Sequence, residues 1–228
     1  MDLGAVKTPP AAVAAARNAQ GLLQDAELLA GAGRAGRAYS LAALAVEECG
    51  KAMDLAILAM VPGTIRAQAP VGRMLEWHQL KLVGGLLLAE VRIGGGAAWL
   101  ADMPIEELTR VLAALDTPAD EADRLKRRGL YVDMDQDHQI HEPMEITEAE
   151  VTAQLGRARQ AAAGAEPLLA PDAQVRIANP HTEAVEFAQD LVNAIAASGN
   201  SRTPKAAADV LVRAIHKLRK RRTPQHRA

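Results

Sequence analysis

Large aromatic side chains are nearly absent from this chain, and their scarcity constrains the fold more than any other feature. Aromatic residues make up 2% of the 228 positions, whereas 49% of the positions are apolar. The core must therefore be built from Ala, Leu, Val, Ile and Met, which suit close packing between helices better than a sheet. A chain of this length can bury a sizeable core. We therefore expect an all-α protein.

Prolines, glycines and capping residues divide the chain into helices. Gly31 and Gly33 end the first helix, and Thr147 and Thr203 are expected N-caps, with Glu150 three residues after Thr147 as in a capping box. Residues 129–143 lose the helical period and predict a loop, or at most one small hairpin. Prolines in residues 164–181 predict an irregular connection. The expected helices cover residues 11–30, 34–60, 72–92, 105–115, 118–128, 147–163, 182–197 and 204–219.

The helices group into two units. Residues 1–165 are expected to form one helical bundle, and residues 166–228 a C-terminal helical extension that ends in a basic tail. The last two helices form a hairpin that is either packed on the bundle or loosely attached to it.

Positive charge is concentrated at the C-terminus. Residues 202–228 hold nine Lys or Arg against Asp209 alone, which leaves the rest of the chain at −10. The stretch "HKLRKRR", which includes Lys217, Arg219 and Arg221, could contact the phosphates of RNA or DNA. A basic last turn also complements the C-terminal end of a helix. Both interpretations stay open.

The sequence predicts a soluble, cytoplasmic protein. The first residues lack the basic start and apolar run of a secretory signal, and no uninterrupted apolar stretch is long enough to span a membrane. The lone Cys49 cannot form an intrachain disulfide or a cysteine zinc site, which fits a reducing compartment. We expect Cys49 to be a small core side chain.

The second helix, "GRAYSLAALAVEECGKA" over residues 36–52, carries charges on an otherwise apolar segment. Several polar side chains fall within an arc of about 120°, so they line a local pocket or an interface: Arg37, Ser40, Glu47, Glu48, Lys51 and Asp54. One interpretation is structural, with Glu47 paired to Lys51 and Arg37 neutralising Glu48. The other is functional, because apolar side chains could replace a purely structural pair at little cost.

The third helix places His78 and Lys81 one turn apart on the same face. Histidine can move a proton near neutral pH while lysine stabilises negative charge on a phosphate, so the pair suits phosphoryl chemistry. The alternative is a partly exposed histidine on a solvated face.

The acidic run Asp133, Asp135 and Asp137 does not fit a calcium loop. An EF-hand needs glycine at its sixth position and a carboxylate at its twelfth, where this chain has His138 and Met144. The spacing of the histidines and aspartates here indicates no particular transition-metal site. The chain also has no P-loop and no nucleophile elbow. We therefore predict neither a metal nor another cofactor.

Four separated segments together resemble the AbiV-type abortive infection proteins of bacteria, members of the HEPN superfamily. They are "NAQGLLQDAELL" from Asn18, the segment from Gly36 quoted above, "HQLK" from His78 and "KRRGLYVD" from Lys126. The resemblance covers roughly residues 15–135, and its most specific part is the pattern of the second helix.

The resemblance implies an all-helical HEPN-like bundle that commonly dimerises and takes part in defence against phage. Many HEPN proteins are metal-independent ribonucleases that use Arg, four to six residues, then His, across a dimer interface. Arg73 with His78 fits that spacing, as do Arg176 with His181 and Arg221 with His226, and we prefer the first pair because it adjoins the His-x-x-Lys segment. Five positions on a continuous helix separate two side chains by about 140°, so Arg73 and His78 share a face only if a helix starts between them.

The sequence thus predicts a homodimeric endoribonuclease that acts on RNA without a metal. His78 would be its general base or acid, Arg73 and Lys81 would stabilise charge, and neighbouring side chains would orient these groups: Glu47, Glu48 and Lys51. Expected substrate contacts are Arg37, Lys126, Tyr131, Asp133, Lys217, Arg219 and Arg221. The alternative is a non-catalytic helical module that binds a phage or host partner and arrests translation. A phage-encoded trigger protein is a further expected partner, and a membrane is not.

Overall fold

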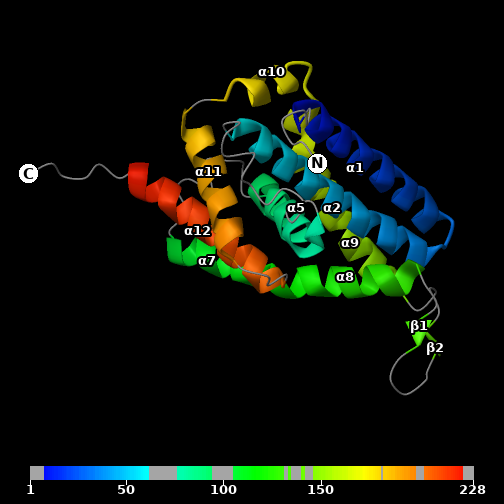
Figure 1. Cartoon of the computed structure of the whole chain (residues 1–228). Helices are drawn as coiled ribbons and strands as arrows, with labels where there is room; N and C mark the ends of the chain where they lie inside the picture. The colour runs from blue at the N-terminus through cyan, green and yellow to red at the C-terminus, as the bar shows by residue number, and fades with distance from the viewer. Residues whose placement is uncertain are drawn as a thin grey trace, which may run out of the picture.

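The computed structural model is almost entirely helical in the residues it describes, as the composition predicts (Figure 1). These are residues 8–61, 76–93, 105–130, 133–134, 140–141, 146–180, 182–198 and 203–222. The helices are α1 (Thr8–Gly31), α2 (Ala35–Met60), α5 (His78–Ile93), α7 (Ile105–Ala114), α8 (Asp116–Leu130), α9 (Glu148–Ala165), the 3-10 helix η2 (Glu166–Leu169), α10 (Ala173–Ala178), α11 (Thr182–Ala197) and α12 (Pro204–Arg222). Strands β1 (Asp133–Met134) and β2 (Ile140–His141) form one antiparallel pair.

A tight turn folds α1 back along α2. Gly33 has φ +70°, a left-handed conformation that glycine adopts without the steric cost of a Cβ atom. Its N–H donates to the carbonyl of Ala30 at 3.0 Å, and the N–H of Arg34 donates to Leu29 at 2.9 Å. The turn therefore satisfies the last carbonyls of α1, and the predicted end of the first helix is confirmed.

Helix α2 is the central element of the bundle. It packs against α1, α5, α8 and α9, and Figure 1 shows these helices around it. Small residues (Ala, Gly, Ser and Cys) occupy ten of its 17 buried positions and leave little side-chain bulk between the backbones, so neighbouring helices approach closely on several sides.

Glycines bring α5 against α2. A Cβ atom on Gly50 would lie 1.9 Å from the carbonyl oxygen of Lys81, and one on Gly85 would lie 2.1 Å from that of Val46. Any larger residue at these positions would push the two helices apart. Because Gly50 and Gly85 have no side chains, α2 and α5 can pack at this short distance.

The C-terminal hairpin packs on the bundle. Leu191 and Ile195 of α11 and Leu211 of α12 are buried in the same hydrophobic cluster as Val46 of α2 and Trp77 before α5. The core is therefore continuous from the bundle into residues 182–215. A second, smaller cluster joins Ile177 of α10 to alanines of α1 and α2.

Most predicted boundaries lie close to those observed. Thr147 caps α9 in a complete capping box with Glu150, as expected, and the hydroxyl of Thr203 accepts from the N–H of Ala206 at 3.2 Å. The short β1–β2 pair is the small hairpin that the sequence allowed within residues 129–143.

Two predictions about helices were wrong. The third helix does not run without interruption from residue 72, because α5 begins at His78 after a non-helical Trp77. The indole of Trp77 is fully buried, so tertiary packing overrides local helix propensity at this residue. The connection over residues 164–181 is also more regular than expected, since it contains η2 and α10. Residues 72–75 lie outside the described part of the chain.

Two further expectations concern membranes and the thiol. Among the described residues, no helix is long and apolar enough to cross a membrane. Cys49 is fully buried in α2, where burial and the nearby Glu48 carboxylate raise the pKa of its thiol to about 12. Its expected role as a core side chain is confirmed.

Replacing Gly50 with Ala should destabilise the protein, because the added methyl group meets the backbone of Lys81. We expect the free energy of unfolding to fall by at least about 2 kcal/mol, as for other overpacked sites. Gly156→Ala is the matched control, since nothing lies within 4 Å of its Cβ position in α9, and it should add about 0.5–1 kcal/mol. Urea denaturation of both variants tests this, and equal effects would contradict the close approach of α2 and α5.

Candidate active site

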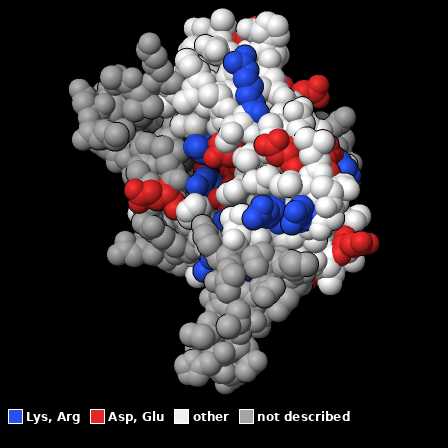
Figure 2. Space-filling model, turned by 90° about the vertical axis from the view of Figure 1, so that its right-hand side faces the viewer, with Lys and Arg blue, Asp and Glu red and all other residues white. Residues whose placement is uncertain are grey.

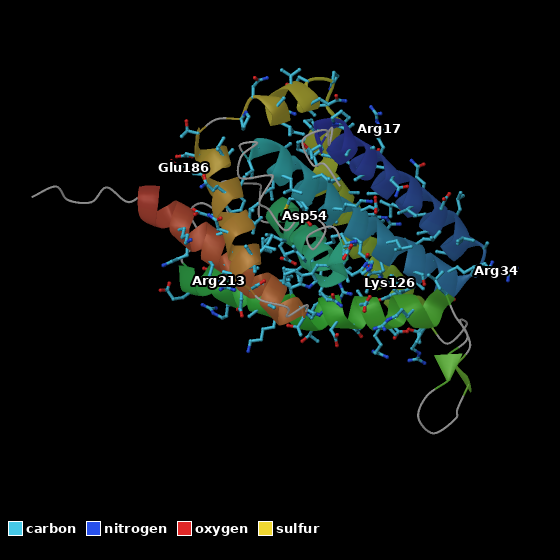
Figure 3. All side chains as sticks on the ribbon, viewed as in Figure 1. Arg17, Arg34, Asp54, Lys126, Glu186 and Arg213 are labelled. Carbon is cyan, nitrogen blue, oxygen red and sulfur yellow. The ribbon has the colours of Figure 1, made fainter. Side chains whose placement is uncertain are left out.

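Glu47 is the centre of a polar cluster within the bundle. Its side chain, on α2, is 4% exposed, and each of its carboxylate oxygens contacts a different helix. Oε2 lies 2.9 Å from Nδ1 of His78 on α5. Oε1 accepts a hydrogen bond from Nζ of Lys126 on α8, which Figure 3 labels between α8 and α2. Three helices therefore meet at one carboxylate.

Helix α8 is held against α2 next to this carboxylate. The hydroxyl of Ser40 lies 2.8 Å from the carbonyl oxygen of Lys126 and 2.9 Å from that of Gly36. A Cβ atom on Gly129 would lie 2.3 Å from the carbonyl oxygen of Gly36. This contact, like the one between α2 and α5, depends on a missing side chain.

His78 links the buried carboxylate to solvent. Its side chain is 57% exposed, and it is the first residue of α5. When the Glu47 carboxylate is ionised it only accepts hydrogen bonds, and Nδ1 of His78 is then the donor in this contact. In the neutral Nδ1–H tautomer, Nε2 carries no proton, and this nitrogen can take one from a bound substrate.

The expected pairing of Glu47 with Lys51 is wrong. Lys51 instead pairs with Glu48, at 3.0 Å and 3.3 Å to its two carboxylate oxygens. Glu47 points inward to α5 and α8, whereas Lys51 is partly exposed. The expected neutralisation of Glu48 by Arg37 is also wrong, because eleven helical positions place them about 16 Å apart along α2.

Lys81 lies one turn after His78 and is buried. Burial is the main influence that lowers the pKa of its ammonium, and Lys51 acts in the same direction, whereas Glu47, Glu48 and Asp54 oppose it. The site thus contains a cation in a sheltered position, where electrostatic interactions are stronger than in bulk water.

Asp54 lies further along α2, in the interior, as Figure 3 shows. Its side chain is 1% exposed, and its Oδ2 has no hydrogen-bond partner among the described residues. Burial raises the pKa of this carboxyl to about 8, and the nearby Lys81 lowers it in part. Asp54 therefore keeps its proton over most of the physiological range.

Several predicted site residues lie away from this cluster, and others lie outside the residues that the structure describes. Arg37 is exposed, and Lys217 is exposed on α12, 3.8 Å from Asp190. Arg73 and Tyr131 lie outside the described residues, as do the side chains of Asp133 on β1 and of Arg219 and Arg221 on α12. Figure 1 shows the C-terminal end of α12 on the opposite side of the bundle from the α1–α2 turn.

Two side chains of α8 occupy positions that the sequence did not predict. Lys126, expected to touch substrate, is buried and contacts Glu47. Asp123 was not singled out, yet it lies 3.1 Å from Nζ of Lys126 and 2.9 Å from Nη2 of Arg127. Their spacing of three and four residues on one helix was the available signal.

The chain is thus a helical bundle with a polar cluster formed by α2, α5 and α8. A protein-family model for AbiV, of the HEPN group, matches residues 9–163. The chain belongs to the AbiV family of HEPN proteins, and the predicted membership and all-helical HEPN-like fold are confirmed. No curated protein and no solved structure matches it significantly.

Stability should depend on the protonation of Asp54. The pKa of Asp54 in the folded protein lies above its ordinary value, so the protonated carboxyl stabilises the fold relative to the unfolded chain. This contribution to the free energy of unfolding is complete below about pH 4 and is lost as the pH rises through about 8. Relative to Asp54→Asn, the native free energy of unfolding should fall by up to about 1.4 kcal/mol per pH unit in this interval. Urea denaturation at several pH values measures the difference, and parallel curves would refute it.

Proposed function

We propose that the protein is an abortive infection ribonuclease that cleaves RNA without a metal, as a cytoplasmic homodimer. The observation that carries the proposal is the contact between the buried Glu47 carboxylate and the exposed His78 imidazole. A buried carboxylate that orients a histidine leaves the second ring nitrogen available for proton transfer. Membership in the AbiV family supports the assignment to phage defence.

The proposed reaction uses the nucleophile that RNA itself supplies. Nε2 of His78 takes the proton of a ribose 2′-hydroxyl, and the 2′-oxygen attacks the adjacent phosphorus. A bond from O2′ to phosphorus forms, the bond from phosphorus to O5′ breaks, and the leaving O5′ receives a proton. The products are a 2′,3′-cyclic phosphate and a 5′-hydroxyl. Donation of that proton by His78 of a second subunit is consistent with a homodimer.

Cations near His78 would stabilise the charge that develops on the phosphate. Lys81 is sheltered one turn away, and Lys51 lies at the rim of the cluster, paired to Glu48. A phosphate in this position would favour the charged form of Lys81 against its burial. Arg73 fits the HEPN spacing, and the break in the helix at Trp77 is consistent with the requirement that a helix start between Arg73 and His78.

RNA binding would also involve the basic C-terminal tail. The face of the molecule in Figure 2 carries acidic and basic side chains next to one another. Mixed charge of this kind does not attract a polyanion strongly, whereas Lys217, Arg219 and Arg221 belong to a run with little negative charge. A phage-encoded protein would release the activity during infection.

Native protein should cleave total RNA in the presence of a chelator, and His78→Ala should abolish cleavage. The loss should be on the order of 10²-fold or more, because the substitution removes the group that moves the proton. Gel analysis of the products and detection of 2′,3′-cyclic phosphate ends provide the measurement.

Arg159→Gln is the control, since it disrupts only an exposed ion pair with Glu27 on the α1–α9 surface. Cleavage that persists unchanged in His78→Ala would overturn the proposal. Protection from phage that survives His78→Ala would instead favour the non-catalytic module that binds a partner.

Removing charge from the tail should weaken RNA binding and its dependence on salt. In the triple variant Lys217→Gln, Arg219→Gln and Arg221→Gln, the slope of log K against log salt should become shallower by about 0.7 for each phosphate that the tail no longer neutralises. The matched control removes three exposed arginines elsewhere, Arg17, Arg34 and Arg159. Fluorescence anisotropy with a labelled RNA at several salt concentrations distinguishes the two, and equal slopes would exclude the tail from binding.

A further inference from the structure

We propose that Lys126 is a positioning residue, which keeps the Glu47 carboxylate ionised and thereby holds His78 in the tautomer with the proton on Nδ1. Its importance for catalysis rests on the proposed function of His78. The sequence suggested that Lys126 touches RNA, whereas its contacts lie inside the bundle.

The ammonium group of Lys126 is buried between two carboxylates. Its side chain is 10% exposed, with Glu47 on one side and Asp123 at 3.1 Å on the other. Asp123 is in turn bound by Arg127 at 2.9 Å. A lysine so enclosed cannot reach a phosphate outside the bundle without breaking both ion pairs.

The backbone of Lys126 is fixed as firmly as its side chain. Its carbonyl oxygen lies 2.8 Å from the hydroxyl of Ser40, and the close approach at Gly129 follows one turn later. Both contacts join α8 to α2, the helix that carries Glu47. The distance between the ammonium and the carboxylate is therefore set by the packing of two helices.

The charge balance explains why Glu47 needs this cation. Glu47 contacts His78 of α5 and Lys126 of α8, the buried Lys81 of α5 interacts with it electrostatically, and Asp123 of α8 shares the ammonium of Lys126. Without Lys126, a carboxylate that is 4% exposed would have Asp123 near it and no direct ammonium contact from α8. Burial and a neighbouring negative charge both favour a protonated carboxyl.

A protonated Glu47 would reverse the hydrogen bond to the imidazole. The carboxyl would then donate to Nδ1, and the ring proton would move to Nε2. The exposed nitrogen could no longer accept a proton from a substrate. Lys126 thus acts on His78 through Glu47, without touching the reacting atoms.

The test is the tautomer of His78, read from the ¹⁵N signals of its ring at pH 7.5 in the full-length protein. Native protein should contain the Nδ1–H form predominantly, and in Lys126→Met the Nε2–H form should rise to about half or more. Lys126→Gln should shift the tautomer population in the same direction, because an amide can donate to Glu47 but carries no charge. This substitution also preserves a polar side chain of similar length, so it disturbs the packing less than methionine does. Arg124→Met is the matched control, since it removes one positive charge from an exposed position of the same helix.

Kinetics separate a positioning lysine from one that binds RNA. In Lys126→Met, kcat should fall on the order of 10²-fold while KM and the salt dependence of binding stay near native values. A raised KM with unchanged kcat would overturn the inference and would indicate that Lys126 contacts RNA. So would a native tautomer in both Lys126 variants, whether or not the protein cleaves RNA. If the native protein cleaves no RNA, the proposed function fails while the tautomer measurement still decides the role of Lys126.

Discussion

The close approach of α2 to α5 and α8 is the constraint on which the rest of this structure depends. Gly50 and Gly85 allow the first contact, and Gly129 with Ser40 allows the second. The result is that one carboxylate of the central helix reaches an imidazole from one neighbour and an ammonium from the other. A polar cluster inside an alanine-rich bundle is costly to desolvate, and the three helices offset that cost by supplying partners of opposite charge. Packing and electrostatics therefore specify the same arrangement.

Local signals in the sequence predicted the helices well, because caps, prolines and glycines act over a few residues. The Thr147 capping box and the glycine turn after α1 are examples. The interruption at Trp77 was missed because it follows from burial of the indole in a core that distant segments complete. The i,i+4 rule predicted a Glu47–Lys51 pair for the same reason: it considers one helix alone, whereas α5 and α8 offer Glu47 two partners that lie far away in the sequence.

The family match ends at residue 163, whereas the hydrophobic core continues into α11 and α12. Leu191, Ile195 and Leu211 pack in the same cluster as Trp77, directly before the candidate catalytic histidine. The C-terminal hairpin packs against α5 through α12, and it also leads into the basic tail. This arrangement connects the part of the chain proposed to bind RNA with the part proposed to cleave it.

The burial of Cys49 has a practical consequence. The chain has one cysteine, and its thiol is enclosed in α2 with a pKa near 12, so little thiolate exists at neutral pH to react with alkylating reagents or oxidants. A cysteine introduced on the surface would then be the preferred site of attachment for a fluorophore or spin label. Distances between the tail and the bundle, or between the subunits of the proposed homodimer, become measurable without first removing a native thiol.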